Sequence, residues 1–284
     1  MKTVNSLSGG KTSSYIAANY KANYNVFALV RTSDKKCMFP DKKIRQKVSD
    51  KLGVEFIGTL EENAIIYTML DLEQYIGEEI FWVTGKTFDD VVNRNGIRYL
   101  PNATQRFCTV EMKLQPIFDW WRSEINDVVE MRIGFRANEQ KRAKTMLSKT
   151  NKNSYLEHKT IVGKTKNGKK NRWKLVEWQK PVFPLINDNI YKDQIENYWK
   201  NKNVRFAYMN NCIGCFHRNP VLLKLMSDKH PNKFQWFINQ ETAAGYGNRT
   251  FKNGTTYKRI KNSLKQTKLF DDDFNDCDSG YCGL

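Results

Sequence analysis

The segment that most constrains the fold is the run Ser6–Ser14 (SLSGGKTSS), near the start of the chain. A short apolar stretch, Val4–Leu7, precedes this run, and a helix-compatible stretch, Tyr15–Tyr20, follows it. This order predicts a strand, a tight glycine-rich turn and the start of a helix. Glycines let the backbone approach a ligand closely. The free N–H groups and the dipole at a helix start then favour a phosphate.

Hydroxyl groups and one lysine add further donors to this turn, which lacks the spacing of a Walker A loop. The alternative is an ordinary serine- and glycine-rich turn, because short glycine-rich motifs occur often by chance. The expected phosphate-binding residues are Ser8, Gly9, Gly10, Lys11, Thr12, Ser13 and Ser14.

Strand-like and helix-like segments alternate along the first half of the chain. We expect strands at 25–31, 54–57, 79–84 and 128–135, and helices at about 41–52, 71–75 and 114–122. Gly53 is a plausible C-cap of the helix 41–52. The alternation predicts an α/β fold with a doubly wound, mostly parallel sheet, in which ligands bind outside the carboxyl ends of the strands.

The remaining segments suggest two regions. Residues 1–186 are expected to form the nucleotide-binding α/β domain, with a basic, hairpin-like insertion at about 159–176 whose alternative reading is a solvated surface loop. Residues 187–284 are expected to form a helical extension that carries cysteines and ends in a weakly ordered tail. A helix in this extension should place Tyr191, Ile195 and Trp199 on one face.

Charge and composition narrow the class of protein. The net charge is +17, with 47 Lys and Arg against 30 Asp and Glu. Such an excess suggests a polyanionic partner, first of all nucleic acid, although a lysine-rich composition alone would produce it too. No apolar stretch approaches the roughly 20 residues that span a membrane, and no secretory h-region is found. We therefore expect a cytoplasmic protein, in which six cysteines point to metal binding or redox chemistry rather than disulfides.

Two charged motifs lie near the predicted strand at 128–135, one before it and one that includes its end. In the first, Gln105–Ile117, Arg106 and Lys113 are expected to lower the pKa of Cys108 and favour the thiolate. In the second, Met131–Arg142, two arginines follow the strand with Glu139 between them. Arg136 and Arg142 would be placed there to clamp a phosphate, unless the segment is only a solvated charged turn.

The second motif with cysteines is the C-x-x-C pair Cys212 and Cys215, which presents two thiolates to one centre. No second C-x-x-C pair exists, so Cys108 is the candidate third ligand. The fourth is Cys37, Cys277, Cys282 or His217, or is absent.

Taken in order, these motifs resemble those of the PP-loop ATP pyrophosphatase and phosphoadenosine phosphosulfate (PAPS) reductase-like superfamily, the adenine nucleotide α-hydrolase-like proteins. The glycine turn is similar to S-G-G-x-D-S, with Thr12 in place of Asp, and residues 106–116 match R-[WF]-C-T-x-x-x-K-x-x-P. Residues 134–142 resemble G-x-R-x-D-E-x-x-R, with Asn138 in place of Asp. Pro184–Ile186 matches P-L-[IL], and the C-G-L tail at 282–284 is similar to the one that carries the nucleophilic cysteine of sulfonucleotide reductases.

The resemblance implies an adenine nucleotide, ATP or PAPS, with Mg²⁺ as a further candidate. It implies nucleotide contacts from Arg106, Lys113, Arg136, Glu139 and Arg142, and a [4Fe–4S] cluster on Cys108, Cys212 and Cys215, with zinc as the alternative. The implied catalytic residues are Lys11, Cys108 and Cys282.

Three functions are then open. The first is ATP-dependent adenylation followed by sulfur transfer to a nucleic-acid (tRNA or DNA) or small-molecule acceptor, with a sulfur donor. The second is reduction of PAPS or adenylyl sulfate to sulfite with a thioredoxin-type reductant. The third is a non-catalytic, nucleotide-binding accessory protein, which the two missing carboxylates at Thr12 and Asn138 keep open.

Overall fold

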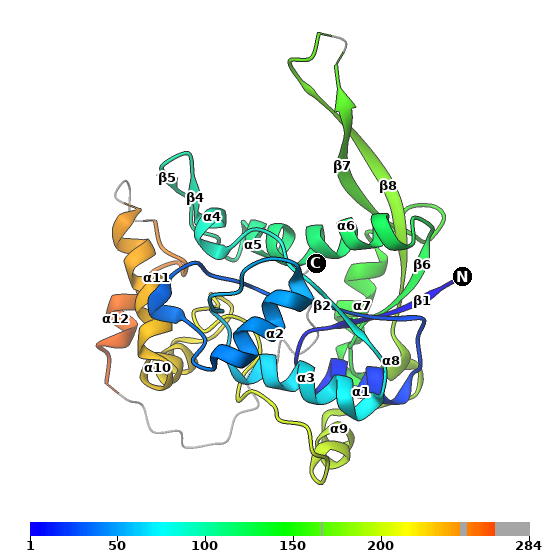
Figure 1. Cartoon of the computed structure of the whole chain (residues 1–284), viewed down its shortest axis with the longest axis horizontal. Coiled ribbons are helices and arrows are strands. Elements are labelled where there is room, and N and C mark those ends of the chain that lie inside the picture. Colours follow the sequence, from blue (N-terminus) through cyan, green and yellow to red (C-terminus); the bar gives the residue numbers. More distant parts are fainter. Residues whose placement is uncertain (166, 245–248, 265–284) are drawn as a thin grey trace.

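The computed structural model describes residues 1–165, 167–244 and 249–264, and its centre is a six-stranded sheet (Figure 1). The strand order is β3-β2-β1-β6-β8-β7. All neighbouring pairs are parallel except β7 and β8, which form an antiparallel hairpin at one edge. The strands are β1 (Thr3–Leu7), β2 (Tyr24–Ala28), β3 (Ile80–Val83), β6 (Val129–Arg132), β7 (Leu156–Lys164) and β8 (Asn171–Val182).

Helices cover both faces of this sheet, because alternate side chains of the buried strands enter two different cores. Phe27 of β2 packs with α1 (Lys11–Asn19) and α3 (Ala64–Ile76). Its neighbours Val26 and Ala28 pack with α6 (Gln115–Glu124) and α7 (Gln140–Leu147). The α/β class and the mostly parallel sheet are thus confirmed, and the arrangement is compatible with double winding.

The order of the strands reverses at β1. The strands β2 and β3 follow on one side of it, whereas β6 lies on the other. A crevice at such a reversal, outside the carboxyl ends of the strands, is where ligands bind in open α/β sheets. The turn after β1 and the turn after β6 meet there, because a Cβ atom placed on Gly134 would lie 3.3 Å from Cγ2 of Thr12.

A third core joins the C-terminal helices to the carboxyl side of the sheet. Phe234 and Phe237 of α11 (Pro231–Ala243) and Tyr257 of α12 (Tyr257–Lys261) pack in one cluster with Cys108 and Met112. The elements of this part are α4 (Phe88–Val92), β4 (Asn93–Arg94), β5 (Ile97–Arg98), α5 (Phe107–Thr109), the π-helical η2 (Val110–Leu114), α10 (Pro220–Lys229), α11 (Pro231–Ala243) and α12 (Tyr257–Lys261).

Several predicted elements are confirmed, and two predictions are wrong. The helix 41–52 is α2 (Lys42–Leu52), with Gly53 as its C-cap at φ +65°, and the basic insertion is the outer part of the β7–β8 hairpin. Residues 54–57 form no strand: they follow the end of α2, and the neighbouring Gly58 makes only isolated bridges, with Thr32 and Met38.

The second correction concerns the helix after Pro184, which is divided into α8 (Pro184–Asn187) and α9 (Lys192–Trp199). Ile195 and Trp199 share a face as predicted, and both are buried in the core that includes α1. Tyr191 precedes α9 as its N-cap residue and is 47% exposed, so it does not share their face. Of the described helices, none is long and apolar enough to cross a bilayer.

Candidate functional site

The glycine turn lies directly between β1 and α1, as the sequence predicts. Gly10 is the N-cap residue of α1, with φ −96° and ψ 159°, and among the described residues no side chain caps the helix start. Gly9 has φ +81°, and a Cβ atom at this position would lie 2.6 Å from Cγ2 of Ile65 on α3. Both the left-handed backbone and the close approach of α3 therefore require glycine at position 9.

The serines of the turn mainly bond to the turn itself. The Ser13 hydroxyl accepts from the Ser8 backbone N–H at 3.1 Å and donates to the Gly10 carbonyl at 3.2 Å. Thr12, Ser13 and Ser14 are buried, and the Ser14 hydroxyl has no hydrogen-bond partner among the described residues. These side chains shape the turn, and the backbone N–H groups at the start of α1 are the donors available to an anion.

Helix α9 lies across this turn. Its Glu196 forms an ion pair with Lys11, and the indole N–H of Trp199 donates to the Lys11 carbonyl at 3.0 Å. Lys11 and Glu196 remain partly exposed. The sequence predicted that the lysine of the turn binds phosphate. In the structure it forms an ion pair with a carboxylate instead.

The arginine motif after β6 lies beside the glycine turn. Glu139 accepts hydrogen bonds from the Arg136 backbone N–H at 2.9 Å and from Arg136 Nε at 3.1 Å, and it also pairs with Arg142. The Arg142 guanidinium is 4.4 Å from the centre of the Phe135 ring. Two arginines gathered on one carboxylate keep this side of the crevice cationic, which suits a polyphosphate.

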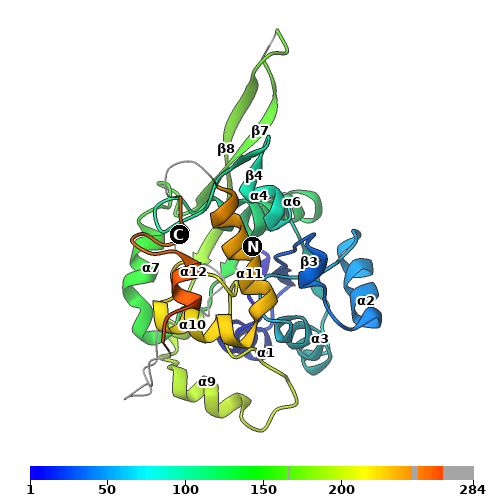
Figure 2. The same ribbon diagram turned by 90° about the vertical axis from the view of Figure 1, so that its left-hand side faces the viewer.

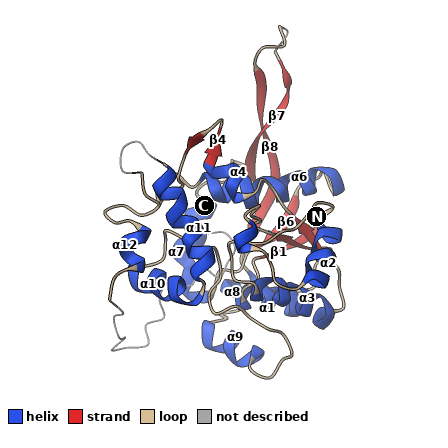
Figure 3. Ribbon diagram, turned by 60° about the vertical axis from the view of Figure 1, so that its left-hand side comes forward, coloured by secondary structure: helices blue, strands red, loops and turns tan. Residues whose placement is uncertain are grey.

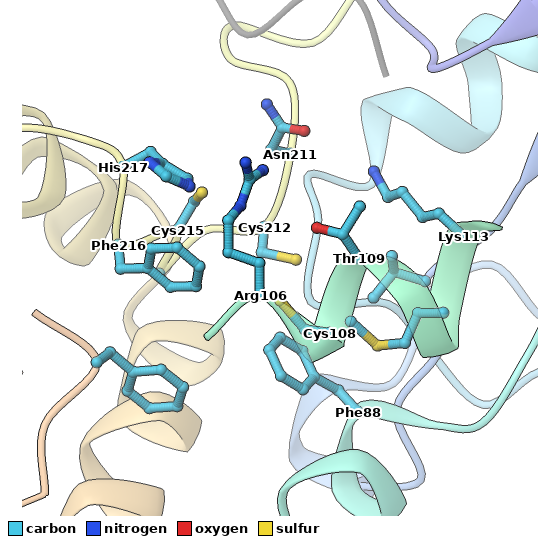
Figure 4. Close-up of a pocket in the computed structure, with 14 residues that line it drawn as sticks. Phe88, Arg106, Cys108, Thr109, Lys113, Asn211, Cys212, Cys215, Phe216 and His217 are labelled. Atoms are coloured by element: carbon cyan, nitrogen blue, oxygen red, sulfur yellow. The ribbon is translucent and has the colours of Figure 1, made fainter. Parts of the chain in front are cut away.

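The three expected metal ligands line one pocket (Figure 4). Cys108 comes from α5, and Cys212 and Cys215 come from the loop before α10. Phe88, Phe216 and Phe251 supply apolar walls, and Arg106, Lys113 and His217 are polar residues in the same lining. Figure 4 shows the Cys108 and Cys212 thiols projecting into the same space, with Cys215 beside His217.

Burial controls the protonation of these thiols. It raises the pKa of Cys108 to about 11, an effect that the nearby Cys215 adds to and Arg106 only partly offsets. Burial raises the pKa of Cys212 well above its usual value as well. The expectation that Arg106 and Lys113 lower the pKa of Cys108 is therefore wrong for the metal-free protein, because desolvation outweighs the cations. Lys113 acts on Cys212 instead.

Arg218 organises the backbone of the C-x-x-C loop. Its guanidinium donates to the carbonyls of Asn210, Asn211 and Cys212. The Tyr257 hydroxyl donates to the Gly214 carbonyl at 2.9 Å, and the Cys215 N–H donates to the Cys212 carbonyl at 3.0 Å. The loop is thus fixed by bonds to its carbonyls, which lets the thiols face the pocket.

Gly214 lets this loop pack on the ring of Phe237. A Cβ atom on Gly214 would lie 2.5 Å from Cγ of Phe237, whose side chain is fully buried. We expect Gly214→Ala to lower the free energy of unfolding by about 1–3 kcal/mol, the usual cost of overpacking. Chemical denaturation measures it. Phe237→Leu, which removes ring atoms, should make the added methyl less costly in the double variant; an equal cost in both backgrounds would contradict this packing argument.

The segment Leu60–Ile65 connects the cysteine pocket to the glycine turn. The Ile213 N–H donates to the Leu60 carbonyl at 2.8 Å, and Lys113 pairs with the buried Glu61 at 3.0 Å. At its other end, Ile65 packs against Gly9. One short segment therefore touches both candidate sites.

Buried charges that the sequence motifs did not predict hold this segment in place. Lys233 is only 7% exposed and donates to the Glu61 carbonyl and to Asn63 Oδ1, and its burial lowers its pKa to about 8. Glu62 accepts from the Met209 N–H at 2.6 Å and lies 3.3 Å from His230. The available signals were the adjacent acids at 61–62 and one lysine among the aromatic residues of α11.

The cysteine pocket fits an iron–sulfur cluster by the chemistry of its donors. Thiolates select iron–sulfur clusters or zinc, and Arg106 and Lys113 would offset the negative charge of a thiolate-bound cluster. Within the described residues, no three His, Cys, Asp or Glu side chains converge on one metal ion.

The candidates for the fourth ligand differ in whether they line the cysteine pocket. His217 lines the pocket with the three cysteines. Cys37 is buried in the same hydrophobic core but is not among the residues of the pocket lining, and burial raises the pKa of its thiol to about 12. Cys277 and Cys282 lie outside the described residues, as does Lys166 in the basic insertion.

Comparison of the chain with protein-family models, with curated proteins and with solved structures finds no match.

Proposed function

We propose that the protein is an ATP-dependent sulfurtransferase that adenylates an oxygen of its acceptor and then replaces that oxygen with sulfur. The observation that carries this proposal is the joint position of the two sites. The glycine turn follows β1, and the cysteine pocket includes Val30, just beyond the end of the neighbouring β2. Both therefore lie at the carboxyl edge of the sheet, joined by the segment Leu60–Ile65.

The glycine turn suits the first step. The acceptor oxygen attacks the α-phosphorus of ATP, and the bond from this phosphorus to the α,β-bridging oxygen breaks. Pyrophosphate leaves with the electron pair. The N–H groups at the start of α1, together with Lys11, Arg136 and Arg142, would stabilise the charge on the departing pyrophosphate. A Mg²⁺ ion bound to the nucleotide would assist in the same way.

The cysteine pocket suits the second step. A sulfur nucleophile attacks the atom that bears the adenylated oxygen, and AMP leaves with that oxygen. The sulfur itself comes from a sulfur-donor protein or another sulfide source. Cys108, Cys212 and Cys215 would hold a four-iron cluster, which supplies a site for bound sulfide when one iron lacks a protein thiolate. The apolar walls from Phe88, Phe216 and Phe251 would keep water from competing for the activated acceptor.

The test is product analysis under anaerobic conditions with ATP, a sulfide source and nucleic-acid or small-molecule acceptors. The proposal expects AMP and pyrophosphate in equal amounts, stimulated by the correct acceptor. Sulfite formed from PAPS or adenylyl sulfate, lost in Cys282→Ser and without any pyrophosphate, would establish the reductase instead. Nucleotide binding with neither product would establish an accessory protein.

The Lys11–Glu196 pair leads to a prediction about affinity. A polyphosphate that binds Lys11 must displace Glu196, so removing this carboxylate should favour the nucleotide. We expect Glu196→Gln to bind ATP about 2–5-fold more tightly, as suits a partly exposed pair. Isothermal titration calorimetry measures it, with Asp193→Asn on the same helix as the charge-matched control. An equal gain in the control would mean that net charge, and not the pair, sets the effect.

A further inference from the structure

The β7–β8 hairpin projects away from the body of the protein in all three views (Figures 1–3). Its inner part is anchored: the His158 ring stacks on Phe118 of α6 at 4.2 Å, and Trp178 is buried beside them. Beyond this anchor, from Lys159 to Val176, the described side chains of the ribbon are largely exposed. We call residues 159–176 the outer ribbon.

The outer ribbon carries charge of one sign. It contains seven Lys or Arg residues and no Asp or Glu. The register pairs Thr160 with Lys174, Gly163 with Arg172, and Lys164 with Asn171. Directly opposed residues share a face, and successive residues alternate between the faces. Cations therefore lie on both faces and near the tip.

One face of the outer ribbon also presents apolar side chains. Ile161 pairs with Trp173, and Lys159 pairs with Leu175. Trp173 and Leu175 are each 56% exposed, and the Lys159 ammonium lies 5.5 Å from the Trp173 ring centre. Exposed apolar side chains beside several cations and no anion are typical of a surface that binds a partner, and the charge favours a polyanion as that partner.

The dimensions of the ribbon favour duplex DNA. The major groove of B-DNA, about 12 Å wide and about 8.5 Å deep, admits a two-stranded β-ribbon. The run Lys159–Lys164 extends roughly 20 Å at about 3.3 Å per residue, which is enough to cross that groove. The major groove of A-form RNA is deep and narrow, so side chains cannot read it.

We propose that the outer ribbon binds duplex DNA by lying in the major groove. Lys164, Lys169, Lys170, Arg172 and Lys174 then contact phosphates, and the face of Trp173 turns toward the base edges and thymine methyl groups. If the bound DNA is also the sulfur acceptor, that part of the inference rests on the proposed function. The binding itself needs no nucleotide and no turnover.

A second basic projection lies on the same side of the molecule. The short hairpin β4–β5 points in the same direction as the outer ribbon in Figures 1–3. It carries Arg98, together with Arg94, which is paired with Glu111. The Arg249 guanidinium donates to the Arg98 carbonyl at its base. Two cationic projections that point the same way suit a long, rod-like polyanion better than a small anion.

The test measures binding of the full chain to a short labelled DNA duplex across a salt series, without ATP. The variant carries Lys164→Gln, Lys169→Gln, Lys170→Gln and Arg172→Gln. Its charge-matched control carries Lys42→Gln, Lys43→Gln, Lys47→Gln and Lys200→Gln, which are exposed and lie on α2 or at the end of α9. The competitors are an RNA duplex of the same sequence, single-stranded DNA, and vesicles that contain phosphatidylserine.

We expect the ribbon variant to bind DNA at least about tenfold more weakly. Its slope of log affinity against log salt should fall by about 0.9 for each phosphate that the protein no longer neutralises, up to about 3.6 for four phosphates. Trp173→Ala should weaken binding without changing the slope, because it removes no charge. The control should bind like the wild type, and all variants should keep the wild-type thermal midpoint and ATP affinity.

Three results would overturn the inference: unchanged DNA binding by the ribbon variant, an equal loss in the control, or an RNA duplex or vesicles bound as tightly as DNA. Failure of the proposed function has a different signature. There DNA binding stays dependent on the outer ribbon, while no acceptor stimulates release of pyrophosphate.

Discussion

Replacing Cys212 by serine should remove most of the iron from anaerobically purified protein, together with its visible absorption. Cys212 shares one pocket with Cys108 and Cys215, and loss of one thiolate leaves a cluster without one of its bonds to the protein. We expect Cys108→Ser and Cys215→Ser to have the same effect. Each variant should contain less than about a third of the iron in the wild-type protein. Iron and sulfide analysis with absorption spectroscopy measures it.

Cys37→Ser is the control for this experiment, because Cys37 is buried in the same core but does not belong to the pocket lining. It should keep the iron even if it lowers stability. A Cys212→Ser protein with full iron and unchanged stability would show that the cluster hypothesis is wrong. The same variants measured with zinc would show which metal the thiols prefer.

The glycine turn and the mostly parallel sheet were predictable because their signals are local. The turn from strand to helix at Gly9 and Gly10 depends mainly on residues that are neighbours in the chain. The end of α2 at Gly53 is a local signal of the same kind. Residues 54–57 show the limit of local signals. Their apolar character suggested a strand, but they pair with no strand of the sheet, and the neighbouring Gly58 makes only isolated bridges.

The chemistry of the cysteines was only partly predictable. That Cys108, Cys212 and Cys215 share a pocket agrees with the family resemblance, whereas the pKa of Cys108 depends on burial that no spacing encodes. The buried contacts of Lys233 depend likewise on the packing of α11 against a distant segment. Charges near in sequence are thus poor guides to a pKa once tertiary structure removes water.

Gly10→Asp should greatly weaken nucleotide binding. Gly10 is the N-cap residue of α1, with dihedral angles that any residue adopts, and aspartate is a favoured N-cap residue. Gly10 is buried, so a carboxylate there also costs stability, and the thermal midpoint is measured beside the affinity. A carboxylate at this position would face the phosphates, and two charges about 4 Å apart repel by about 4 kcal/mol at an effective dielectric constant of about 20. Allowing for screening, we expect ATP affinity to fall at least about 100-fold by calorimetry.

Gly10→Asn is the matched control, because asparagine has nearly the same size and also favours the N-cap position but carries no charge. If the turn binds phosphates, the asparagine variant should keep far more affinity than the aspartate variant, and added salt should narrow the gap between them. Equal losses in both variants would mean that the side chain blocks the crevice by its volume. Wild-type affinity in both would mean that the nucleotide binds elsewhere, and the phosphate site after β1 would have to be abandoned.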